Sequence, residues 1–151
     1  MEYAHKQALV GHRWVISKII LLHLPMPALA FAIDYMDKVI VACLILSALF
    51  TFLLTKGLNA KSEDEFVLSH WQTAIKRSHY LLYGYVIAVI VMAIGWLISI
   101  NQTEQGMKEI LFSAFTHLAT LPILFPAIFV FFLQAISMAK AKKGLKPTTI
   151  F

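Results

Sequence analysis

The stretch YLLYGYVIAVIVMAIGWLISI, Tyr80 to Ile100, runs through the middle of the chain without a charged residue. At about 1.5 Å per residue, roughly 20 apolar residues are needed to cross the hydrocarbon core of a bilayer. An uncharged run of this length is typical of a transmembrane helix rather than of a helix in a soluble core. The stretch therefore predicts a membrane protein.

The composition of the whole chain agrees with that prediction. The chain has 151 residues, of which 60% are hydrophobic and 14% are charged. Soluble domains carry about 25% charged residues. A net charge of +5 often indicates nucleic-acid binding, but here the lysines and arginines lie at the ends of apolar blocks. We therefore expect the lipid bilayer as the partner and no nucleic acid.

Four apolar blocks are long enough, or nearly so, to span the bilayer. They predict an all-α fold, an integral membrane four-helix bundle in up-down-up-down order, forming a single transmembrane domain over residues 1–151. The helices are expected at approximately 13–34, 38–56, 79–100 and 109–139.

The distribution of positive charge predicts the orientation of the bundle. All but two of the 13 lysines and arginines fall on one side of this arrangement, and the exceptions are Lys38 and Lys108. Loops rich in lysine and arginine face the cytoplasm. Both termini are therefore predicted to be cytoplasmic.

Several residues outside the apolar cores have structural interpretations. The sequence KSEDEF predicts a helix from about Glu63 with Ser62 as its N-cap, lying at the interface or running into the third helix. Lys18 is expected to extend to the inner interface, and His5 and His70 are expected at the surface. Gly84, Ala88 and Gly95 form a stripe of small residues that permits close helix contact.

Two histidines at membrane depth are the strongest candidates for a chemical role, because ionisable residues there are costly. His23 lies about ten residues into the first helix and His117 about eight residues into the fourth, which gives them similar depths. Facing imidazoles in a four-helix bundle suit bis-histidine ligation of a haem iron. The alternative is a histidine that only hydrogen-bonds a helix carbonyl.

A second layer is permitted by the same geometry. His12 and His23 are eleven residues apart and therefore lie on nearly the same face of a helix. His79 begins the third helix at the level of His12. His12 and His79 are thus a second candidate pair, with a solvated position near the headgroups as the alternative.

Short motifs in this chain resemble the bacterial cytochrome b561 family, which are four-helix membrane cytochromes with two b-type haems. The third helix carries W-x-x-A-x-x-x-x-H-x-x-x-Y followed by G-W-L, which are Trp71, Ala74, His79, Tyr83 and Gly95–Leu97. GHRWVISKIILL, with His12 and Trp14, resembles the first helix of the family, and FSAFTHLATL places His117 where the family has an outer-haem ligand.

The resemblance implies haem b as a cofactor, one or two per chain, in a bacterial inner membrane. It also implies electron transfer to or from quinone or a redox partner protein, as in a membrane oxidoreductase or electron carrier. The ligand set is incomplete, however, because the second helix contains no histidine and Phe131 stands near the place of the second ligand on the fourth helix. Two readings stay open: a divergent haem protein, or a haem-free accessory or structural subunit that retains the scaffold.

Overall fold

The computed structural model describes residues 2–30, 32, 35–59 and 64–147. All of the regular elements in this part of the chain are helical. They are α1 (Glu2–Lys18), the π-helical turn η1 (Ile19–His23), α2 (Met26–Ala30), α3 (Met36–Asn59), α4 (Glu65–Ile100), α5 (Gln105–Leu118) and α6 (Leu121–Lys142).

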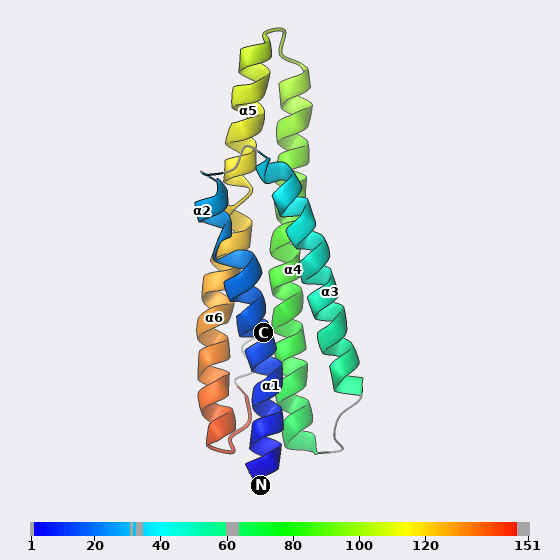
Figure 1. Ribbon diagram of the computed structural model, residues 1–151, viewed down its shortest axis with the longest axis vertical. Helices are drawn as coiled ribbons and strands as arrows, with labels where there is room; N and C mark the ends of the chain where they lie inside the picture. Colours follow the sequence, from blue (N-terminus) through cyan, green and yellow to red (C-terminus); the bar gives the residue numbers. More distant parts are fainter. Residues whose placement is uncertain (1, 31, 33–34, 60–63, 148–151) are drawn as a thin grey trace.

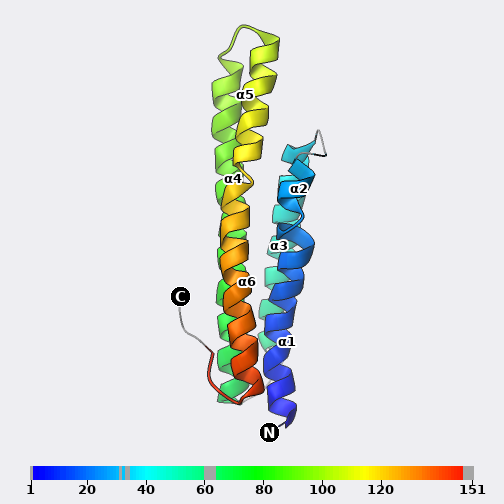
Figure 2. The same cartoon turned by 90° about the vertical axis from the view of Figure 1, so that its left-hand side faces the viewer.

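The elements form four roughly parallel rods whose chain directions alternate (Figure 1). α1 with η1 and α2 makes the first rod, α3 the second, α4 the third, and α5 with α6 the fourth. Seen from the side, α1 and α3 form one layer and α4 and α6 the other (Figure 2). The hairpin of α4 and α5 projects beyond the ends of α2 and α3, so four rods meet only over the lower part of the molecule.

α4 organises the fold because α1, α3, α5 and α6 all pack against it. It starts at Glu65, where the carboxylate of Asp64 accepts a hydrogen bond of 2.9 Å from the Phe66 amide as an N-cap. The predicted start at residue 79 was therefore wrong, and the short helix expected near Glu63 continues into the third helix. Ser62, the expected N-cap, lies outside the described residues.

Two glycines on α4 allow the fourth rod to approach closely. A Cβ atom on Gly84 would lie 2.5 Å from the Pro122 carbonyl oxygen, and one on Gly95 would lie 2.2 Å from Phe115 Cβ. Both distances are shorter than any van der Waals contact, so only glycine fits at these positions. The predicted role of the small-residue stripe is confirmed.

The first rod differs most from its predicted form. α1 begins at Glu2 rather than near residue 13, and the regular helix gives way to a π-helical turn at Ile19–His23. Pro25 and Pro27 follow and lack the amide hydrogens needed to continue regular pairing. The Leu22 carbonyl instead accepts a hydrogen bond from the hydroxyl of Tyr85 on α4.

The fourth rod is also divided. α5 ends at Leu118 and α6 begins at Leu121, with Pro122 in the first turn of the second helix. Proline is tolerated there because the first amides of a helix have no partner within it. The break lies inside the predicted helix 109–139, which is therefore two helices in line.

Within the described ranges, three stretches are long and apolar enough to cross a membrane: Met36–Gly57, Glu65–Ile100 and Gln105–Lys142. The outward face of α4 carries large apolar side chains that are about half exposed, among them Ile87, Ile90, Ile94 and Leu97. Water disfavours such a surface and lipid does not. The chain is thus an all-α protein of four rods with transmembrane helices.

Candidate functional site

The polar interior of the molecule begins with His12, which is completely buried on α1. Its Nδ1 is hydrogen-bonded to the side-chain oxygen of Gln134 on α6, and its Nε2 lies 2.9 Å from Nδ1 of His70 on α4. His70 is also completely buried, and its Nε2 donates a hydrogen bond of 3.0 Å to the Leu145 carbonyl. One line of hydrogen bonds therefore connects α6, α1, α4 and the segment after α6.

The number of hydrogens in this line restricts its chemistry. Two neutral imidazoles carry one ring hydrogen each, but three bonds that end on the oxygens of Gln134 and Leu145 require three. If Gln134 instead presents its amide nitrogen to His12, two neutral rings satisfy all three bonds. Oxygen and nitrogen of a glutamine amide are assigned from such networks. The same Gln134 oxygen lies 3.4 Å from Arg77 Nη1, so a turned amide would bring its nitrogen against that donor. With the oxygen toward His12, the three bonds require one of the two imidazoles to carry a second ring hydrogen.

A buried arginine adjoins the same line. Arg77 on α4 is 1% exposed, and its Nη1 donates to the Leu133 carbonyl and to Ser137 Oγ, both at 2.9 Å. A longer contact of 3.4 Å reaches the side-chain oxygen of Gln134. Arg77 thus joins α4 to α6 at the level where the histidine line ends.

A second buried cation lies on the other side of α4. Lys18, at the end of α1, is 1% exposed, and its Nζ donates to Thr51 Oγ1 at 2.9 Å. It also donates to Ser78 Oγ at 2.9 Å and to the Ser78 carbonyl at 3.1 Å. All three ammonium hydrogens therefore have acceptors inside the protein. The expectation that Lys18 extends to the interface was wrong, because α1, α3 and α4 enclose it.

Lys18 is not paired with a carboxylate among the described residues. The two ion pairs found there, Lys6 with Glu2 and Lys146 with Glu65, have strongly exposed side chains. Two hydroxyls and a carbonyl satisfy Lys18 instead. Buried charge without a counter-ion is costly, so this arrangement is an unusual feature of the interior.

His23 is completely buried at the end of the π-helical turn. Its Nδ1 lies 3.3 Å from the Lys18 carbonyl, and its ring packs edge-to-face against Tyr85 with 4.9 Å between centroids. Its Nε2 has no hydrogen-bond partner. His23, one of the two histidines expected at membrane depth, therefore has a buried ring nitrogen that forms no hydrogen bond.

His79 and His117 are half-buried and share one local geometry. Each lies within hydrogen-bond distance of the carbonyl four residues earlier, His79 with Ile75 at 2.9 Å and His117 with Ser113 at 2.7 Å. In each case Nδ1 donates and Nε2 points away from that carbonyl. This geometry is common for histidines that ligate metals, and it also occurs in helices without a ligand.

The structure does not join the expected pairs. The contacts of His23 are with Lys18 and Tyr85, and His12 is bonded to His70 rather than to His79. Among the described residues, no group of three or more histidine, cysteine or acidic side chains is arranged to hold a metal ion. Both nitrogens of His12 are engaged in hydrogen bonds, to Gln134 and to His70.

Sequence reasoning missed His70, Arg77 and Gln134 as members of the interior. The signal was present on α4, where buried residues recur at helical spacing: Val67, His70, Trp71, Ala74, Arg77, Ser78, Leu81, Gly84, Tyr85 and Ala88. Seeing it required knowing that the helix starts at Glu65. His70 was expected at the surface because it precedes the apolar span predicted at 79–100.

Comparison with protein-family models, curated proteins and solved structures finds no match for this chain. The family resemblance described above therefore rests on the motifs in the sequence. The assignment of function rests on the geometry of the interior.

Proposed function

We propose that the chain is an integral membrane protein of the bacterial inner membrane, with both termini in the cytoplasm. The two ends of the bundle support this orientation. The end of the bundle where α3 ends, α4 begins and α6 ends carries Lys56, Lys140, Lys142, Lys143 and Lys146, and Lys61 falls between α3 and α4 in the sequence, whereas the opposite end has only Lys38 and Lys108. Helices α3, α4 and α5–α6 supply three of the membrane spans, and the rod of α1, η1 and α2 crosses as the fourth.

Within that membrane we propose that the chain acts as a haem-free accessory or structural subunit. The observation that carries this proposal is the direct hydrogen bond between His12 and His70. Ring nitrogens that face each other at 2.9 Å leave no room for an iron and a macrocycle between them. The buried polar groups stabilise the packing of α1, α4 and α6, and the apolar outer surface is available to lipid and to other membrane subunits.

The second candidate is electron transfer through haem, with quinone or a redox protein as partner. The observations that favour it are the buried Nε2 of His23, which forms no hydrogen bond, and the ligand-like geometry of His117, which His79 shares. A haem held there would supply one-electron chemistry. The chain would hold the iron through these imidazoles, between helices of the bundle.

A difference spectrum separates the two candidates. The protein is produced in cells supplied with iron and a haem precursor, purified in detergent, and measured as the dithionite-reduced minus the oxidised form. The proposal of a haem-free subunit expects no α-band and no haem in a pyridine assay. A stoichiometric b-type spectrum would contradict it.

Variants assign any haem that is found. Under the second candidate, His23→Ala and His117→Ala each remove or shift the spectrum, whereas His5→Ala serves as the control. Loss of haem in His12→Ala would show that the His12–His70 bond opens to accept iron. That result would also contradict the haem-free proposal.

A further inference from the structure

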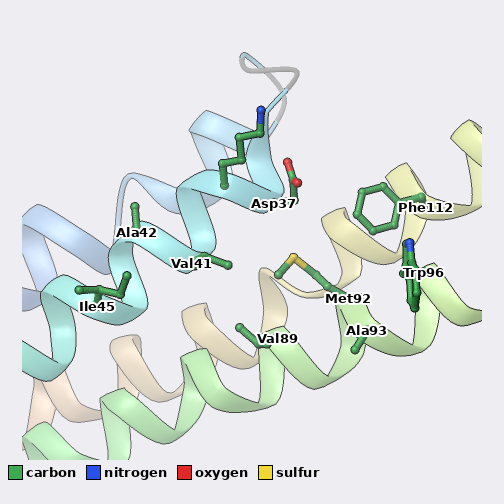
Figure 3. A pocket seen from close by; sticks show the side chains of 10 residues that line it. Asp37, Val41, Ala42, Ile45, Val89, Met92, Ala93, Trp96 and Phe112 are labelled. Atoms are coloured by element: carbon green, nitrogen blue, oxygen red, sulfur yellow. The ribbon is translucent and has the colours of Figure 1, made fainter.

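A groove of about 540 Å³ lies between α3 and α4, next to Phe112 of α5. It is at the end of the molecule where α3 begins. Its walls are the apolar side chains of Val41, Ala42, Ile45, Val89, Met92 and Ala93. Figure 3 shows the side chains of the first three on α3 and those of the last three on the neighbouring α4. The volume falls in the range of about 300–1,000 Å³ that is usual for small-molecule sites.

The end of the groove nearest the start of α3 has a different chemistry. Asp37 lies there, across the groove from Trp96 on α4 and Phe112 on α5 (Figure 3). Asp37 is half-buried, and no salt bridge or side-chain hydrogen bond engages its carboxylate within the described part of the chain. A carboxylate beside two aromatic rings attracts an ammonium group, through charge and through the faces of the rings.

A positively charged residue follows Asp37 in the sequence. Lys38 also lines the groove, and its Nζ lies 4.7 Å from the centre of the Tyr35 ring. An anionic group close to the ammonium would therefore meet a cation of the protein. This end of the groove thus offers one negative and one positive group, next to its apolar part.

We propose that this groove binds one phospholipid with a primary ammonium headgroup. The ammonium lies on the Asp37 carboxylate beside Trp96, the phosphate lies near Lys38, and one acyl chain fills the apolar part of the groove between α3 and α4. Charge complementarity selects this occupant, because an anionic lipid without an amine would place negative charge against Asp37. A plain apolar helix from another subunit would leave both charged groups without a partner.

The position of the site in the membrane agrees with this occupant. In the proposed orientation, the start of α3 lies at the outer interface, where tryptophan is commonly found at headgroup level. The groove then runs from the headgroups of the outer leaflet toward the middle of the bilayer. The proposal depends on membrane insertion, and it is independent of whether the protein holds haem.

Trp96 provides a reporter for the test. The protein carries three tryptophans; Trp71 is buried, and Trp14 is exposed on α1 and is removed as Trp14→Phe. This variant is reconstituted into phosphatidylcholine vesicles that contain a small, equal fraction of lipid with brominated acyl chains. The brominated lipid is phosphatidylethanolamine, phosphatidylcholine or phosphatidylglycerol. Bromine quenches Trp96 when the labelled lipid occupies the groove.

The expected result is strongest quenching by brominated phosphatidylethanolamine. Asp37→Asn should lower the apparent affinity for this lipid about fivefold, the effect of losing roughly 1 kcal/mol. Glu109→Gln is the matched control, because it removes an exposed carboxylate of α5 that does not line the groove. A circular-dichroism spectrum and elution volume equal to those of the parent show that the variant is folded.

Three outcomes would overturn the proposal. Equal quenching by the three lipids would mean that the groove meets only bulk lipid, and preference for phosphatidylglycerol would mean that Lys38 dominates recognition. Absence of quenching by any lipid would mean that another polypeptide segment covers the groove. Unchanged selectivity in Asp37→Asn would contradict the assigned role of the carboxylate.

Discussion

Lys18 at the end of α1 is bonded twice to one residue of α4: its ammonium donates to the hydroxyl and to the backbone carbonyl of Ser78. A third bond reaches Thr51 on α3, so one buried side chain connects three rods. Arg77, the residue before Ser78 on α4, donates a hydrogen bond to the Leu133 carbonyl on α6. Two adjacent residues of α4 therefore anchor contacts with α1, α3 and α6.

Replacement of Lys18 by methionine tests the cost of this buried charge. We expect the midpoint of thermal unfolding in detergent to stay the same or rise, because apolar replacements of buried ionic groups are often neutral or stabilising by about 1–4 kcal/mol. Thr51 and Ser78 keep a mutual hydrogen bond of 2.9 Å without the ammonium. Lys6→Met, at an exposed site, is the control. A fall of several degrees in Lys18→Met alone would show that the charge itself stabilises the fold.

Glycine-to-alanine substitutions test the close contact between α4 and the fourth rod. Gly84→Ala and Gly95→Ala should each lower the free energy of unfolding by about 1–3 kcal/mol, because the added methyl group overlaps Pro122 or Phe115. Gly106→Ala meets nothing within 4 Å and should be neutral or stabilise the helix by up to about 1 kcal/mol. Thermal unfolding midpoints provide the comparison. Equal behaviour of the three variants would contradict the close packing.

The break in the first rod can be tested through Tyr85. Tyr85→Phe removes the hydroxyl that donates to the Leu22 carbonyl, and should cost about 1–3 kcal/mol because the carbonyl is left buried without its donor. Tyr83→Phe removes the same atom from an exposed side chain and should have little effect. The variants are compared by unfolding midpoints in detergent. If both change stability equally, the Tyr85 bond does not support the π-helical turn.

The fold class could be predicted from the sequence because long uncharged runs leave few alternatives to a membrane helix. The predicted helix 38–56 lies inside α3 (Met36–Asn59), and the predicted helix 79–100 ends where α4 ends, at Ile100. The start of α4 was missed because Lys76, Arg77 and His79 suggested the end of the hydrophobic segment. A helix that buries its polar residues against neighbouring helices continues through such a segment.

The interior of the site was less accessible to sequence reasoning. Depth along a helix can be counted from residue numbers, but the direction of a side chain depends on where the helix begins and how it is broken. The π-helical turn rotates the chain after Lys18, so the relative directions of His12 and His23 do not follow from regular helical spacing. Hydrogen bonds such as His12 with His70 connect residues 58 apart and depend on packing.

The central claim is that His12 and His70 are bonded to each other and hold the interior together. A double-mutant cycle tests it: unfolding free energies are measured for the parent, His12→Ala, His70→Ala and the double variant in the same detergent. We expect each single variant to lose about 1–3 kcal/mol, and the double variant to lose less than the sum by about 0.5–1.5 kcal/mol. Additive losses would contradict the bond between the two histidines.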